Sequence, residues 1–424
     1  MFSSLFSTAP PVDPKAQNFH SVADRFKDNE LFAELEPTDT ELLCANSGFV
    51  TETQVWYIIT EDGTSIWCQI IHSAVGLWYP TIQFNCKVSN PSKGENAWKS
   101  INVSNFVCPP PGQDKRSSKA DEFTITHKSH PNSEFPESYT INANLGQDLQ
   151  VALELKRPSS APGYKVGKGP NGGYSYFGPD VEKPEGYVIH RFWPMLHASG
   201  HVIRSGKAEA VSAHGMFVHA IQGMRPNLVA SAWNFGHFHS NELGGVSAIQ
   251  MEFTTQTTHG KHGAGSGGAA VNIGSLVVGG KLVTVTAETK WPGEDAHGAV
   301  ISRATHIDPQ TDVETGYGQP SKIEYSWAGS SIDASAPGTV EAKVTTDLGS
   351  VDTPKGLIDK VDVLAEIPYV LKVAVNYVAG TKPYIYQWLN PAKLSIKGPD
   401  ALAPGLSAGV EVDGYIYNEA TFIS

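Results

Sequence analysis

Short segments that alternate apolar and polar residues follow one another along almost the whole chain. Examples are SYTINANL at 138–145, VSAIQMEFTT at 246–255 and TVEAKVTTDLG at 339–349. At every second position of such a segment the side chain faces the same side of a strand, so one face packs and the other meets water. Turn clusters such as EDGT and NPSKGEN leave connections too short for parallel crossovers. The pattern therefore predicts antiparallel meanders.

The segments form two series of similar length, from about residue 53 to 207 and from about 246 to 423. Within the first series, a Gly- and Pro-rich stretch from Arg157 to Gly186 is expected to be a long ordered loop. FHSVADRF at 19–26 has the apolar spacing of a short amphipathic helix. RPNLVASAWNF at 225–235 is expected to start a second short helix at its proline.

We therefore predict an all-β fold of two antiparallel β-barrels in tandem, with short helices at the N-terminus and near the domain junction. Regularly spaced strands favour closure into barrels because closure removes exposed edges. The expected divisions are a membrane-contact segment at 1–18, a helix and linker at 19–45, and barrels at 46–213 and 214–424.

The N-terminal stretch MFSSLFSTAPP has none of the three parts of a secretory signal. Phe2, Leu5 and Phe6 have helical spacing and would share one face, but Pro10 and Pro11 end any helix after about two turns. Two interpretations stay open, a disordered terminus and a small apolar wedge that a membrane interface stabilises.

Charge and hydropathy exclude two further classes of protein. The formal net charge is −12 and no Lys/Arg cluster occurs, which argues against nucleic acid as a partner and against a polybasic membrane contact. No apolar run reaches the length of a membrane-spanning helix.

Residues that commonly carry chemistry do not form a recognisable motif. GKGPNG and GAGSGG match the dinucleotide fingerprint, but neither joins a strand to a helix. The histidine pairs HASGH, HFH and HGKH lack a converging third ligand, and the four cysteines lie far apart in sequence. We expect buried or hydrogen-bonded side chains at these positions, with no metal site, no catalytic residue and no cofactor.

Two long strings, GMFVHAIQGMRPNLVASAWNF and VNIGSLVVGGKLVTVT, and the C-terminal GYIYNEATFIS carry a family resemblance. With WCQIIHSAVGLWYPTIQFNCKV in the first half, they make the chain, from about Val50 to Ser424, resemble the fungal survival-factor family of tandem lipocalin-like proteins. The resemblance implies two lipocalin-like barrels, survival under oxidative and cold stress, and transfer of ceramide from the endoplasmic reticulum to the Golgi.

The resemblance also implies a location and a way of touching membranes. The protein is expected in the cytoplasm, peripherally bound to endoplasmic reticulum and Golgi membranes, with the nucleus as a further location. An N-acetylated amphipathic N-terminus would make the contact, and Met1-Phe2 is a suitable start for acetylation. The prolines at 10 and 11 leave a shorter helix than the family has, so membrane residence should be weaker.

Aromatic residues near the junction of the halves are the candidate lipid-binding residues, since an eight-stranded barrel can hold one small ligand. They are Trp193, Trp233 and Phe235, with His190 and Arg191 beside them. In an alternative hypothesis the protein is a lipocalin-type hydratase or pericyclase, and His190 and Arg191 polarise an apolar polyene. In a third, both barrels are fully packed and the protein only binds other proteins.

Overall fold

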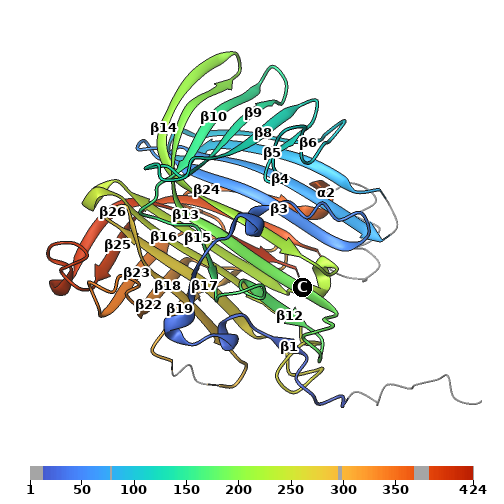
Figure 1. Cartoon of the computed structure of the whole chain (residues 1–424), viewed down its shortest axis with the longest axis vertical. Coiled ribbons are helices and arrows are strands. Elements are labelled where there is room, and N and C mark those ends of the chain that lie inside the picture. Colours follow the sequence, from blue (N-terminus) through green and yellow to red (C-terminus); the bar gives the residue numbers. More distant parts are fainter. Residues whose placement is uncertain (1–12, 77–78, 295–297, 367–381, 424) are drawn as a thin grey trace, which may run out of the picture.

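Two large antiparallel sheets make up the molecule, and each curls toward a barrel (Figure 1). A computed structural model describes residues 13–76, 79–294, 298–366 and 382–423. Strands dominate this part of the chain, and its two α-helices, α1 (Pro226–Val229) and α2 (Val363–Glu366), are single turns. The predicted all-β fold with two barrel-like sheets is confirmed. No helix in the described ranges is long and apolar enough to cross a bilayer.

The first sheet has the strand order β6-β5-β4-β3-β14-β13-β10-β9-β8-β7. Phe84 of β5 stacks on Phe123 of β8 with 5.0 Å between ring centroids, so the two halves of the sheet close over a shared interior. The strands are β3 (Gly48–Ile59), β4 (Ser65–Gly76), β5 (Thr81–Asn90), β6 (Glu95–Asn102), β7 (Ser118–Lys119), β8 (Phe123–Ser129), β9 (Glu137–Asn144), β10 (Leu149–Arg157), β13 (Gly186–Arg204) and β14 (Lys207–Gln222).

The second sheet runs β18-β17-β16-β15-β26-β25-β23-β22-β19, with β24 paired to β25. Its end strand β18 contacts β19 and β22, which nearly closes the barrel. The strands are β15 (Ala232–Ser240), β16 (Val246–Thr254), β17 (Ala270–Val278), β18 (Lys281–Lys290), β19 (Ile301–Ile307), β22 (Lys322–Ser330), β23 (Thr339–Asp347), β24 (Leu357–Asp362), β25 (Tyr384–Lys397) and β26 (Val410–Phe422), beside a small ribbon of β20 (Gln310–Thr311) and β21 (Gly318–Gln319).

Large aromatic side chains fill the interior of the second sheet. Tyr325 donates its hydroxyl to the carbonyl of Phe235 at 3.1 Å, and the indole of Trp327 donates to the carbonyl of Ile249 at 2.8 Å. Both bonds cross the barrel from β22 to strands on the opposite wall. Gly274 makes room for this arrangement, because a Cβ there would lie 2.6 Å from Trp327 Cδ1. These interiors hold packed side chains.

The N-terminal strap, residues 13–35, bridges the two sheets: its two strands pair within the first sheet, and the strap also contacts the second sheet. Asn18 donates its backbone N–H to the carbonyl of Gly260 at 3.1 Å, and Ser21 accepts a hydrogen bond from Thr289 at 2.6 Å. The strap contains β1 (Phe19–His20), the 3₁₀ turns at Ala23–Arg25 and Asp28–Glu30, and β2 (Phe32–Glu34).

Two local predictions are wrong, and one ladder explains both. The helix expected at 19–26 is replaced by β1 and a 3₁₀ turn, because Phe19 pairs with Phe177 and is fully buried. Phe177 lies in the stretch expected to be a loop, which forms β11 (Tyr164–Val166) and β12 (Tyr174–Phe177). The short helix starting at Pro226 is confirmed as α1.

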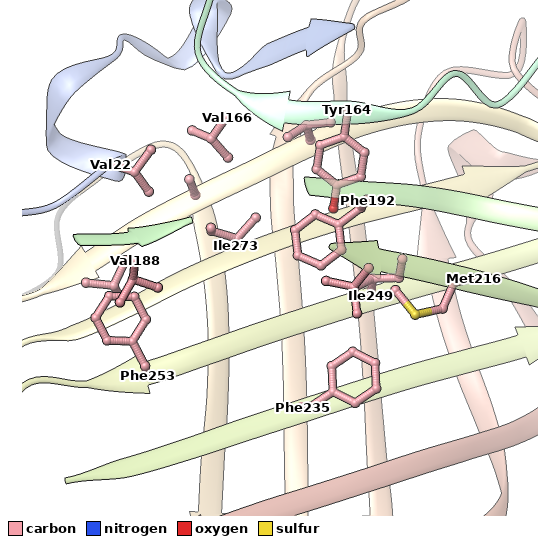
Figure 2. Close-up of a cluster of buried hydrophobic side chains, with 14 of the residues drawn as sticks. Val22, Tyr164, Val166, Val188, Phe192, Met216, Phe235, Ile249, Phe253 and Ile273 are labelled. Atoms are coloured by element: carbon pink, nitrogen blue, oxygen red, sulfur yellow. The ribbon is translucent and has the colours of Figure 1, made fainter. Parts of the chain in front are cut away.

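The two sheets pack face to face through their central strands. In β3, Trp56 and Ile58 belong to the core of the first sheet, whereas Val55 and Ile59 belong to the cluster between the sheets. Strands buried on both faces read as continuous apolar runs, which is why VWYII loses the alternation. Figure 2 shows Phe192, Met216 and Ile249 of this cluster pointing toward one another. β14 crosses the division expected between residues 213 and 214, and the four-part division of the chain stays a prediction.

Candidate functional site

A pocket of about 200 Å³ lies between the two sheets, beside their packed interface. We call it the seam pocket. The first sheet contributes Tyr57, Trp67, Gln69, Ile71, Gln83, Asn85, Lys87, Trp98 and Ser100, and the second contributes Val361, Val363, Ile385, Gln387, Tyr417 and Glu419. It is therefore a site that neither half of the chain could form alone.

Strand alternation places polar residues of β5 in this pocket. Phe84, Cys86 and Val88 fill the interior of the first sheet. The residues between them, Asn85 and Lys87, must then face outward. In an isolated barrel this face would meet water, but β24, β25 and β26 cover it.

A buried ion pair joins the two sheets at the pocket. The ammonium of Lys87 donates to Asp359 at 2.7 Å and to the side-chain oxygen of Gln387 at 2.8 Å. Lys87 is 1% exposed, and its ammonium lies 4.7 Å from the ring centroid of Trp98, within cation–π range. The charge of Lys87 is thus compensated inside the protein.

Glu419 lies beside this ion pair. It accepts hydrogen bonds from Gln387 at 3.1 Å and from the hydroxyl of Tyr417 at 3.2 Å. Burial raises the pKa of Glu419 above its ordinary value, while the hydrogen bonds from Gln387 and Tyr417 act in the opposite direction. A carboxyl with a raised pKa in such surroundings can take up a proton and donate a hydrogen bond.

Part of the remaining wall of the seam pocket is apolar, beside the polar side chains of Gln69, Gln83 and Ser100. The apolar part is made by Ile71 of β4, Val361 of β24, Val363 of α2 and Ile385 of β25. Apolar walls with a few converging polar groups are typical of small-molecule sites. The arrangement can bind a molecule with an apolar body and a polar end. Among the residues that the structure describes, no three His, Cys, Asp or Glu side chains are placed to hold a metal ion.

The structure separates the lipid-binding residues expected from the sequence. Trp193 is 1% exposed in the core of the first sheet, with its ring centroid 5.0 Å from that of Tyr139. Phe235 lies between the sheets, 4.8 Å from the ring centroid of Tyr57, and so packs behind a residue of the seam pocket. Trp233 is half-buried against Phe253, at 5.2 Å between ring centroids.

His190 and Arg191 are neighbours on β13 and therefore point to opposite faces of the sheet. Burial lowers the pKa of His190 to about 4, and its ring lies 5.8 Å from that of Trp233. Arg191 donates to the carbonyl of Asp39 and lies 3.5 Å from the carboxylate of that residue. One ligand cannot meet both side chains from the same side. The expected membrane-contact residues Phe2, Leu5 and Phe6 lie outside the described residues.

Sequence reasoning missed the polar residues of the seam pocket. Lys87 and Asn85 alternate with apolar residues in TIQFNCKV and so looked like the wet face of a strand. The one available signal was the row of tryptophans near them, Trp67 and Trp98, which an ordinary wet face does not need.

Comparison with known proteins identifies relatives over the whole length. A family model described as "Svf1 family" matches residues 2–424. "Ceramide-binding protein svf1" of Emericella nidulans is 32% identical over 375 residues, which cover 88% of this chain and 86% of that protein. "Ceramide-binding protein svf-1" of Neurospora crassa is 32% identical over 429 residues, covering 100% of this chain and 97% of the relative.

Solved structures share the architecture at much lower identity. The crystal structure of CghA with Sch210972 aligns with a TM-score of 0.59 and 11% identity, covering 96% of this chain and 98% of CghA. At that identity the likeness supports the fold alone.

Proposed function

Because this chain belongs to the Svf1 family, we propose that it is a ceramide-binding protein whose ligand lies in the seam pocket. The names of its relatives support the ligand class. One structural observation carries the choice of site: the pocket combines apolar side chains with polar groups that come from both sheets. Ceramide has the matching chemistry, with two long hydrocarbon chains joined to a head of one amide and two hydroxyl groups.

We further propose that binding serves transport, without catalysis. A carrier needs no catalytic group, and each CH₂ group of the ligand that the protein buries is worth about 0.8 kcal/mol. In this proposal the protein is cytoplasmic and moves ceramide from the endoplasmic reticulum to the Golgi, and thereby supports survival under oxidative and cold stress. Phe2, Leu5 and Phe6 supply the transient membrane contact.

The ligand test is extraction of the full-length protein purified from its native cells. Lipids released by organic solvent are identified and counted by mass spectrometry. We expect ceramide in near-stoichiometric amount, and we expect Ser100→Trp, which fills the pocket from β6, to remove it. Thr345→Trp on the exposed face of β23 is the matched control and should keep the lipid. No lipid, or a cyclised or hydrated polyene in place of ceramide, would overturn the proposal.

The transport step has its own test. Ceramide transfer between donor and acceptor liposomes should fall when residues 1–9 are deleted or when Phe2 and Phe6 are replaced by Asp, and flotation with liposomes should be lost. Ceramide bound in detergent solution should stay unchanged in these variants. If flotation and transfer both persist, the N-terminal contact is rejected while ceramide binding stands.

A further inference from the structure

Three buried polar atoms on residues of the seam pocket have no hydrogen-bond partner among the described residues. They are Nε1 of Trp67, Oδ1 of Asn85 and Nε1 of Trp98. Trp67 and Asn85 are each 7% exposed. A buried polar group without a partner costs about 1–3 kcal/mol, and native proteins leave few of them. Three such atoms belong to residues that line this one pocket, where a bound molecule can supply the missing partners.

Strand register gathers these groups. Lys87 of β5 lies opposite Trp67 of β4 on one side and opposite Trp98 of β6 on the other. Asn85 is two residues from Lys87 on the same face, and its amide donates to Gln69 at 3.1 Å. That bond fixes the orientation of the amide and leaves its oxygen as the open acceptor. The residues that line the pocket thus include two indole donors and one amide acceptor without a partner among the described residues, on adjoining strands.

We propose that Trp67, Asn85 and Trp98 form a headgroup subsite for a small uncharged head that carries an amide and hydroxyl groups. The inference rests on the proposed function and states which part of the ligand these residues recognise. The indole N–H groups donate to the amide carbonyl and to a hydroxyl oxygen. The oxygen of Asn85 accepts from the amide N–H or from a hydroxyl.

Charge excludes phosphorylated heads from this subsite. Among the described lining residues, the charged side chains are Lys87, whose ammonium already pairs with Asp359, and Glu419. A phosphate would therefore enter without a counter-charge, and burying an unpaired anion is strongly unfavourable.

Size excludes bulky heads and sets the direction of the ligand. Ligand pockets for drug-sized molecules span about 300–1,000 Å³, and the seam pocket has about 200 Å³. It holds a ceramide head and the first carbons of its chains, but no added sugar or phosphocholine. The first carbons of the hydrocarbon chains lie against Ile71, Val363 and Ile385, and the rest of the chains extends beyond the pocket. Selection therefore acts on the head, and chain length is tolerated.

The test is competition for a fluorescent ceramide on full-length protein in detergent, with lipids of matched chain length. Ceramide should compete at least tenfold better than diacylglycerol, which has no amide N–H, and ceramide 1-phosphate and sphingomyelin should not compete. Asn85→Leu, Trp67→Phe and Trp98→Phe should each weaken ceramide binding about tenfold, the loss of roughly one hydrogen bond to the ligand. Asn85→Leu should also bring the preference over diacylglycerol close to one.

A control variant and a stability measurement distinguish recognition of the headgroup by these three residues from a purely structural role. Trp291→Phe also removes an indole N–H, but one that donates to Asp24 far from the pocket, and should leave ceramide binding unchanged. In ligand-free protein, Trp98→Phe breaks no side-chain hydrogen bond among the described residues, so the urea midpoint should fall by no more than the weaker contact of phenylalanine with the Lys87 ammonium costs. If the wild type binds no ceramide, the proposed function fails. If it binds ceramide but the three variants keep affinity and selectivity, or if ceramide 1-phosphate competes equally, only the headgroup subsite fails.

Discussion

The ion pair between Lys87 and Asp359 should respond unequally to the loss of its two members. Asp359→Asn leaves the ammonium of Lys87, which is 1% exposed, without its carboxylate. Lys87→Met leaves the carboxylate of Asp359, which is 26% exposed and can be hydrated. The loss of stability therefore depends on which charged group remains and on whether water can reach it.

The structure sets the magnitude of each loss. Removing one partner of a fully buried ion pair costs about 3–5 kcal/mol. Lys87 keeps its bond to Gln387 and its contact with the Trp98 ring, so we expect about 2–3 kcal/mol for Asp359→Asn. For Lys87→Met we expect about 1 kcal/mol or less, because methionine fills a similar volume and water reaches the remaining carboxylate.

Urea unfolding followed by tryptophan fluorescence measures both losses as shifts of the midpoint. The double variant Lys87→Met with Asp359→Leu should fall close to the wild type, since neither member of the pair is left without the other. Lys355 and Asp347 form an exposed pair, 62% and 52% exposed, and supply the control: breaking it from either side should cost less than about 0.5 kcal/mol. Equal losses for Asp359→Asn and Lys87→Met, or a larger loss for Lys87→Met, would refute the reasoning.

Three further predictions concern stability. Burial lowers the pKa of His237 to about 3. It lowers the pKa of three further histidines to about 4, namely His190, His239 and His306. Each of these histidines binds a proton more weakly in the folded than in the unfolded protein. The stability that it contributes is therefore complete above pH 6.5 and is lost as the pH falls toward 4, by about 1.4 kcal/mol per pH unit per histidine. A urea midpoint that stays constant from pH 7 to 4.5 would contradict this. Gly274→Ala should lower the free energy of unfolding by about 1–3 kcal/mol, because the added methyl group displaces Trp327 from its hydrogen bond to the carbonyl of Ile249. The urea midpoint should fall, and an unchanged midpoint would mean that the barrel backbone shifts to accommodate the methyl group. Phe84→Ala should cost about 3–5 kcal/mol because it empties the stack with Phe123, and a loss below 1 kcal/mol would show that the first sheet is loosely packed.

The fold was predictable from the sequence because strand alternation is a local property. Each strand carries the pattern of its own two faces, and short turns dictate antiparallel neighbours. Segments such as TVEAKVTTDLG became β23 with buried and exposed residues in strict alternation. The strap at 19–26 was misassigned because its partner Phe177 is remote in sequence, and helical spacing over eight residues cannot reveal a distant ladder.

The seam pocket was not predictable in the same way. Lys87 and Asp359 are 272 residues apart in sequence. No local sequence pattern predicts which face of the first sheet packs on which face of the second. Trp233 and Phe235 were expected near the ligand because they lie at the junction in sequence. In space the junction is broad, and the seam pocket lies at the side of it where β4, β5 and β6 meet β24, β25 and β26.

The N-terminal strap has a consequence for how this protein is made on the ribosome. Ser21 is hydrogen-bonded to Thr289, which is synthesised 268 residues later. At 5–20 residues per second, the early segment waits roughly 10–50 seconds for its docking surface. During this interval Phe19 and Val22, both almost fully buried in the finished molecule, can contact only their partners in the first half, among them Phe177 and Ser175. The nascent chain therefore completes the cover of its own beginning only when the strands of its C-terminal half have been made.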